Sequence, residues 1–178
     1  HAFTIGQKPA YKNAFLKGKF YNRCHRQGKF DKGLTTKAKK PSFFGKFGNM
    51  LKSQEPYDNA NLAIWKINKQ LCALTEVPSP VVFDGMNLKT YGLLSFDDEI
   101  TAHMATAHPL FDAQLQCWYN IFTEFGTTST YKICSINQQQ QRKIIAEIAT
   151  KVPSYVRSFG MTQHFIILIE SPLVIHPM

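Results

Sequence analysis

Short segments rich in β-branched and aromatic residues recur along most of the chain, and in several of them apolar and polar residues alternate. Both features favour β-strands. In one such segment, alternation would place Tyr131, Ile133 and Ser135 on the same face of a strand. On this basis we predict strands over the following segments: Asn13–Tyr21, Leu62–Asn68, Gln70–Thr75, Val81–Phe83, Cys117–Phe125, Thr130–Ile136, Lys143–Ile148 and His164–Ile169.

Turn-forming pairs separate many of these segments, among them Asp84-Gly85, Asp97-Asp98, Phe125-Gly126 and Val152-Pro153. Strands at this regular spacing, with no helical period between them, predict an all-β fold. A sandwich, a barrel and a propeller would all fit, because the repeat is too loose to distinguish them.

One segment, residues 41–52, has a helical rather than a strand-like pattern. Five apolar residues would share one helix face, with Lys46 and Lys52 turned away: Phe43, Phe44, Phe47, Met50 and Leu51. Together with three lysines just upstream, residues of about 37–52 are predicted to form a basic membrane-contact insertion. Packing on the protein's own core and docking on a partner protein are the alternatives.

The charge is distributed unevenly along the chain. Residues 1–52 carry 13 Lys and Arg against one acid, a net charge of +12, whereas residues 53–178 carry a net charge of −3. This asymmetry predicts an anionic partner for the first third, either a membrane surface or a nucleic acid. Aromatic residues interleaved with the lysines are compatible with a nucleic-acid-binding module, and a solvated basic face is the simpler alternative.

Several classes of protein are excluded because their local sequence motifs are absent. The four cysteines are widely spaced with no Cys-x-x-Cys pair, which is typical of reduced thiols in a cytosolic protein. Walker, dinucleotide and Gly-x-Ser-x-Gly signatures are absent from the sequence. The sequence begins at His1 rather than at a methionine and stops just after a strand-like segment, so we expect an internal stretch of a longer protein. No secretion signal is visible at its start.

Three stretches resemble landmarks of the carotenoid-cleavage oxygenase family, in the family's order. They are Leu74-Thr75-Glu76, the run Met104–Asp112 containing Thr106-Ala107-His108-Pro109, and the run Tyr155–Thr162 containing Ser158-Phe159-Gly160-Met161-Thr162. The family includes carotenoid dioxygenases and the vertebrate retinoid isomerase. The resemblance extends over roughly residues 60–178 and is loose before that.

This resemblance implies a fold and a metal site. The fold would be part of a seven-bladed β-propeller, with residues 1–178 forming one incomplete propeller domain. The site would hold Fe(II) on four histidines, for which neutral imidazoles are suited. His108 matches the first of these histidines, and Glu76 matches a glutamate that orients the second.

At the second ligand position the chain departs from the family, because Arg157 stands where the family has histidine. A guanidinium stays protonated and offers no lone pair to a metal. We therefore predict that Arg157 forms an ion pair with Glu76, the carboxylate left without its histidine.

The resemblance implies an oxygenase that cleaves a conjugated double bond of a carotenoid or apocarotenoid with O2. It also implies a cytoplasmic protein associated peripherally with membranes, from which such substrates must be extracted. An inactive, metal-deficient family member, or a carotenoid-binding propeller, is the alternative that Arg157 suggests. A basic nucleic-acid-binding module is the second alternative.

Overall fold

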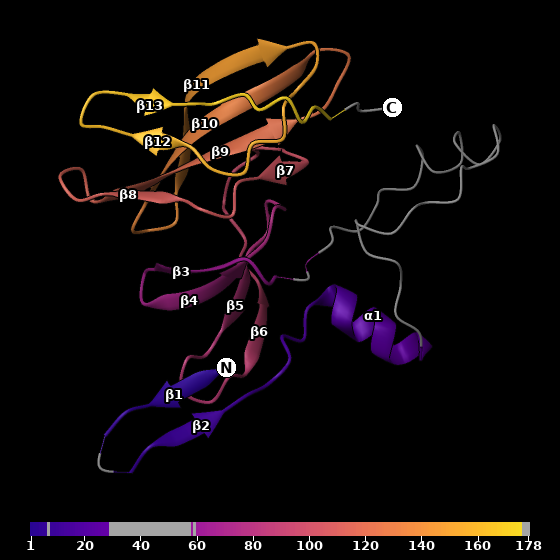
Figure 1. Cartoon of the computed structure of the whole chain (residues 1–178), viewed down its shortest axis with the longest axis vertical. Helices are drawn as coiled ribbons and strands as arrows, with labels where there is room; N and C mark the ends of the chain where they lie inside the picture. Colours follow the sequence, from indigo (N-terminus) through magenta and orange to yellow (C-terminus); the bar gives the residue numbers. More distant parts are fainter. Residues whose placement is uncertain (7, 29–57, 59, 176–178) are drawn as a thin grey trace.

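In a computed structural model, the described residues are 1–6, 8–28, 58 and 60–175, and they form mostly β-sheet with one helix (Figure 1). This agrees with the predicted all-β class, and no closed sheet is found within these residues. The elements are β1 (Ala2–Thr4), β2 (Ala10–Lys12), α1 (Lys19–Gln27), β3 (Ala63–Ile67), β4 (Gln70–Leu74), β5 (Val81–Phe83), β6 (Thr90–Leu93), β7 (Met104–Ala105), β8 (Leu110–Asp112), β9 (Cys117–Glu124), β10 (Ser129–Asn137), β11 (Arg142–Thr150), β12 (Gly160–Met161) and β13 (Ile166–Ile167).

Two antiparallel sheets make up the body of the molecule. The first has the strand order β3-β4-β5-β6, and the second has the order β11-β10-β9-β7, with β8 also paired to β9. In each sheet, most strands pair with the strand that comes next in the sequence, so short turns can connect them. Two separate pairs, β1 with β2 and β12 with β13, complete the described part of the fold.

The main apolar core lies between these two sheets. Trp65, Ile67 and Cys72 of the first sheet share one buried cluster with Phe122 and Ile136 of the second. A smaller cluster on the other face of the second sheet is covered by the chain that follows β11. Both faces of β9 and β10 are therefore buried, as expected for strands enclosed between layers.

The predicted alternation in β10 is confirmed by these two clusters. Tyr131 and Ile133 belong to the smaller cluster, whereas Cys134 and Ile136 belong to the main core. The predicted segments 62–68, 70–75, 81–83, 117–125, 130–136 and 143–148 correspond to β3, β4, β5, β9, β10 and β11. The strand predicted over 164–169 is reduced to the two residues of β13.

The prediction of a strand over 13–21 is wrong, because the chain enters α1 at Lys19. Phe20 and Cys24, one helical turn apart, are the buried residues of this helix. The amides of Lys19 and Phe20 donate hydrogen bonds to the carboxylate of Asp58, at 2.5 and 2.8 Å. A distant side chain thus satisfies the free amides at the start of the helix, which overrides the local strand preference.

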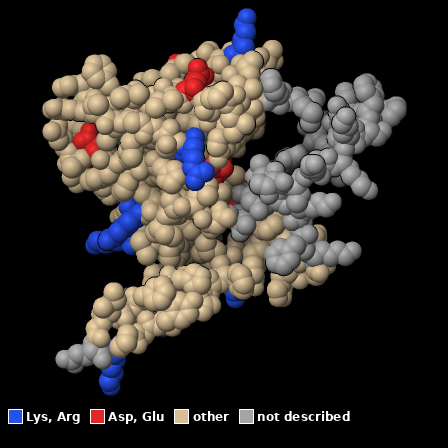
Figure 2. All heavy atoms as spheres, in the orientation of Figure 1, with Lys and Arg blue, Asp and Glu red and all other residues tan. Residues whose placement is uncertain are grey.

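The predicted membrane-contact insertion at about 37–52 lies outside the described residues. Of the basic first third, the described part is the β1–β2 hairpin and α1, and neither contains an acidic residue. On the face shown in Figure 2, a basic side chain protrudes at the hairpin, and the larger part carries both basic and acidic side chains. No helix among the described residues is long and apolar enough to cross a membrane.

Candidate functional site

The three stretches that carry the family resemblance meet at Glu76. This residue follows the end of β4, and its backbone carbonyl accepts a hydrogen bond from the amide of Ala105 in β7, at 3.1 Å. Its half-buried carboxylate accepts a hydrogen bond from the hydroxyl of Tyr155, which lies 79 residues further along the chain. The structure therefore brings together residues that the sequence keeps far apart.

His108 lies in a bulge between two short strands. Ala105 of β7 pairs with Phe122, and Leu110 of β8 pairs with Tyr119. Four residues, 106–109, therefore lie opposite the two residues 120 and 121 of β9. Extra residues on one strand bend it and redirect its side chains. The half-buried ring of His108 makes no hydrogen bond to any residue that the structure describes.

The ion pair predicted between Arg157 and Glu76 is not formed. Within the described residues, Arg157 is exposed and has no carboxylate partner within 4.0 Å. Tyr155, two residues earlier, binds the Glu76 carboxylate instead. The physical reason is that a neutral phenol satisfies a half-buried carboxylate without removing a guanidinium from water, which is costly.

A hydrogen-bond network centred on the buried hydroxyl of Tyr131 anchors the segment that carries Tyr155 and Arg157. The hydroxyl of Tyr131 in β10 accepts a bond from the amide of Ser154, at 2.5 Å, and donates one to the carboxylate of Glu170, at 2.9 Å. Burial raises the pKa of Tyr131, with the Glu170 carboxylate acting in the same direction. The phenol is therefore protonated at neutral pH and can donate to Glu170.

Two of the four cysteines, Cys72 and Cys134, are unsuited to act as nucleophiles. All four are free and buried, as predicted for reduced thiols. Burial raises the pKa of both Cys72 and Cys134 to about 11. Since the thiolate is the nucleophile and the metal ligand, these protonated thiols are packing groups.

The described residues do not form a complete metal site by themselves. Among them, no group of three or more His, Cys, Asp or Glu side chains is placed to hold a metal ion. His108 supplies one imidazole, and Arg157 cannot supply a second donor. The residues of this part of the chain therefore do not fit a four-histidine iron centre without further ligands.

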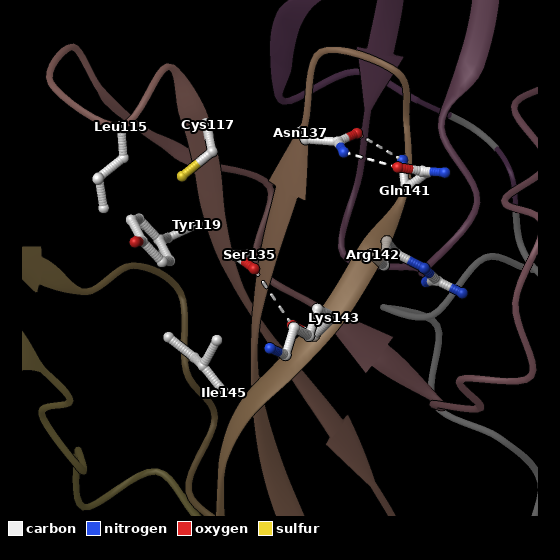
Figure 3. A pocket seen from close by; sticks show the side chains of 9 residues that line it. All are labelled: Leu115, Cys117, Tyr119, Ser135, Asn137, Gln141, Arg142, Lys143 and Ile145. Carbon is white, nitrogen blue, oxygen red and sulfur yellow. Dashed lines mark hydrogen bonds between the residues drawn. The ribbon is translucent and has the colours of Figure 1, made fainter.

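A hollow lies elsewhere, on the second sheet. It has a volume of about 580 Å³ and is lined by Leu115, Cys117, Tyr119, Ser135, Asn137, Gln141, Arg142, Lys143 and Ile145 (Figure 3). Burial, followed by the hydrogen bond with Cys117, raises the pKa of Tyr119 to about 12. Glu76, His108 and Arg157 do not line this hollow. A second space, of about 10 Å³ beside Thr75 and Pro109, is far too small for a carotenoid.

Comparison with known proteins identifies the family. The model of a family described as "Retinal pigment epithelial membrane protein" (RPE65) matches residues 1–178, the whole of the chain. The chain belongs to the RPE65/carotenoid cleavage oxygenase family. The resemblance inferred from Glu76, His108 and the 158–162 run is thereby confirmed.

Curated relatives in this family carry carotenoid-cleaving names. Carotenoid cleavage oxygenase 1 of Neurospora crassa is 30% identical over 118 residues, which cover 65% of this chain and 22% of that protein. The chloroplastic carotenoid cleavage dioxygenase 8 of Arabidopsis thaliana is 22% identical over 182 residues, covering 97% of this chain and 31% of that protein. The chain thus spans less than a third of the length of these two relatives.

Solved structures of the family share the fold. A mutant of the Synechocystis apocarotenoid oxygenase superposes with a TM-score of 0.64 at 21% identity, over 87% of this chain and 33% of that one. The lignostilbene dioxygenase of Pseudomonas brassicacearum gives a TM-score of 0.58 at 21% identity, over 86% of this chain and 31% of that one. At this identity, the likeness concerns the fold alone.

One residue of the site was missed by sequence reasoning. Tyr155 lies within the run that carries the family resemblance, but the sequence gives no sign that it reaches Glu76. Its partner Glu76 follows the end of β4, and the periodicity of a strand cannot predict a contact between residues 79 positions apart. A search for a neutral donor near the unpaired glutamate would have been the available signal, since buried carboxylates are hydrogen-bonded.

Proposed function

We propose that this chain is part of a β-propeller oxygenase that uses Fe(II) and O2 to cleave a conjugated double bond in a carotenoid or apocarotenoid. The observation that carries the proposal is the meeting of the three family stretches at Glu76. The names of the curated relatives point to the same substrate class. Addition of one O2 across one carbon–carbon double bond gives two carbonyl groups, so the atoms balance.

In this proposal His108 is one of the iron ligands. Its ring projects from a bulge and makes no hydrogen bond within the described part of the chain, so a nitrogen lone pair is available to a metal. Glu76 matches the glutamate that orients the second ligating histidine, and with Arg157 at that position its carboxylate binds Tyr155 instead. The remaining histidines would come from parts of the protein beyond this chain, which spans only about a third of its structural relatives.

A second candidate function is carotenoid binding without cleavage. It is favoured by Arg157, which replaces a ligand histidine and has no ion pair with the described residues. Loss of one of four ligands should weaken iron binding severely, because even changes to groups behind the ligands cost about 10–100-fold in metal affinity or activity.

The membrane contact remains part of the proposal. Its basis is the sequence of the insertion at about 37–52, in which apolar residues and lysines alternate in the manner of an interfacial helix. A peripheral location on the cytoplasmic side of a membrane would let the protein extract its water-insoluble substrate. The basic first third would then be attracted to anionic lipid headgroups.

The experiment that separates the two candidates measures iron per chain and carotenoid binding in the complete protein that contains this sequence. Three forms are compared: the natural protein, His108→Ala and Arg157→His. The oxygenase proposal expects iron in the natural protein and its loss in His108→Ala. Carotenoid binding without iron, with iron gained only in Arg157→His, would favour the second candidate. Absence of carotenoid binding from all three forms would refute both.

A further inference from the structure

Hydrogen bonds between two buried residues stabilise the bulge that carries His108. Thr106 stands two residues before the histidine, and Asn120 lies opposite it in β9. Their exposed fractions are 2% and 7%, respectively. Both lie where the pairing of β7 with β9 has ended and that of β8 with β9 has not yet begun.

Thr106 is held at three of its atoms. Its amide donates a hydrogen bond to the carbonyl of Ile121, at 2.9 Å. Its hydroxyl donates to Oδ1 of Asn120, at 2.5 Å, and its carbonyl accepts from Nδ2 of Asn120, at 3.1 Å. The side chain of Asn120 therefore replaces the regular strand pairing that the bulge interrupts.

The orientation of the Asn120 amide is fixed by these partners. Its Oδ1 accepts a second bond, from the amide of Ile121 at 2.9 Å, and its Nδ2 faces the carbonyl of Thr106. If the amide were flipped, its oxygen would face the carbonyl oxygen of Thr106, and two acceptors cannot form a hydrogen bond. The pair thus imposes one arrangement of the backbone that leads into residues 107–109.

We propose that Asn120 and Thr106 are positioning residues for His108, which hold the bulge so that the imidazole points in one direction. The inference rests on the proposed role of His108 as an iron ligand. It adds the two residues that fix the orientation of the His108 ring. Ligating groups must be held to within a fraction of an ångström by the residues behind them, and a bulge without such support would leave the ring free to turn.

The proposal is tested on metal-free, complete protein, so that the result does not depend on iron or on activity. The variants are Thr106→Val, which removes only the hydroxyl, Thr106→Ser, which keeps it, and Asn120→Asp, which replaces Nδ2 by oxygen. Thr123→Val is the matched control, since Thr123 is similarly buried in β9 but its side chain makes no hydrogen bond to the described residues of the bulge. The readouts are the rate at which diethyl pyrocarbonate modifies His108 and the ring signal of isotope-labelled histidine, at about pH 8 where imidazole is neutral.

We expect Thr106→Val and Asn120→Asp to raise the modification rate about fivefold, the ratio that corresponds to loss of one ordinary hydrogen bond. The His108 signal should move toward that of an exposed histidine in both variants. Thr106→Ser should restore the natural values, and Thr123→Val should leave them unchanged.

Two results would overturn the inference. One is an unchanged rate and signal for His108 in Thr106→Val and Asn120→Asp. The other is a general loss of the fold in Thr106→Val, which would make the hydroxyl a determinant of stability rather than of ring direction. Absence of iron or of cleavage in the natural protein would instead refute the proposed function and leave the readouts on His108 interpretable.

Discussion

Replacement of Tyr131 by phenylalanine would separate the polar role of this residue from its role in packing. Tyr131 is 0% exposed, so the ring of the variant fills the same space and only the hydroxyl is lost. The amide of Ser154, itself 3% exposed, then loses its acceptor, and Glu170 loses its donor. A buried amide without a partner costs about 1–3 kcal/mol, and the bond to the exposed Glu170 adds less than that.

The free energy of unfolding of Tyr131→Phe should therefore be about 2–3 kcal/mol lower than that of the natural protein, as measured by equilibrium unfolding in urea. Tyr91→Phe is the matched control, because it also removes a hydrogen bond to a carboxylate, that of Asp84, but at an exposed site. The control should change stability little. Because Ser154 directly precedes Tyr155, the contact with Glu76 should loosen in parallel.

The reasoning would be refuted if Tyr131→Phe were as stable as the control. Such a result would mean that water or another group replaces the hydroxyl, and that the segment from Ser154 to Arg157 is held by packing alone. A loss of about 2–3 kcal/mol with unchanged chemical modification of His108 would show that the network supports the third family stretch, residues 155–162, and not the second, which carries His108.

Three further predictions follow from other contacts. Asp58→Ala should unfold the start of α1 and lower the free energy of unfolding by about 1–2 kcal/mol. Its helical circular dichroism signal should be weaker than that of the natural protein, and Asp58→Asn should lose less of this signal. Equal spectra for Asp58→Ala and the natural protein would contradict this prediction. Arg142 donates hydrogen bonds to Asp98 at 2.5 and 2.8 Å and lowers the pKa of Asp98 below its usual 3.8, so the pair stabilises the fold above about pH 4 and this stabilisation is lost as the pH falls through the lowered pKa. In unfolding experiments, Arg142→Met should therefore lose less stability on acidification than the natural protein. An unchanged dependence of stability on pH would contradict this prediction. Since burial raises the pKa of Cys72 and Cys134 to about 11, neither thiol should react with an aromatic disulfide reagent at neutral pH before unfolding, and rapid labelling of either would contradict the described core.

Long strands could be predicted from their pattern, and the three-residue β5 from its β-branched and aromatic composition. β9 and β10 have eight and nine residues, and their apolar composition identified both. β7 and β8 have two and three residues, too few for any period to appear, yet they flank the bulge that carries His108. The position of His108 could therefore be predicted from a motif, while its setting in a bulge could not.

The errors at α1 and at Glu76 have one physical origin. The amides at the start of α1 are satisfied by Asp58, 38 or 39 residues away, and the carboxylate of Glu76 is satisfied by Tyr155, 79 residues away. Local preference and charge complementarity predicted a strand in the first case and an Arg157 ion pair in the second. In both cases a tertiary hydrogen bond decides the outcome, and the sequence carries no local record of it.

The most direct test of the proposed function is to incubate the complete protein with an apocarotenoid and isotope-labelled O2 and to analyse the products by mass spectrometry. We expect carbonyl products that contain labelled oxygen and that disappear in His108→Ala. An apocarotenoid that stays intact in the iron-loaded natural protein, or cleavage that continues unchanged in His108→Ala, would contradict it.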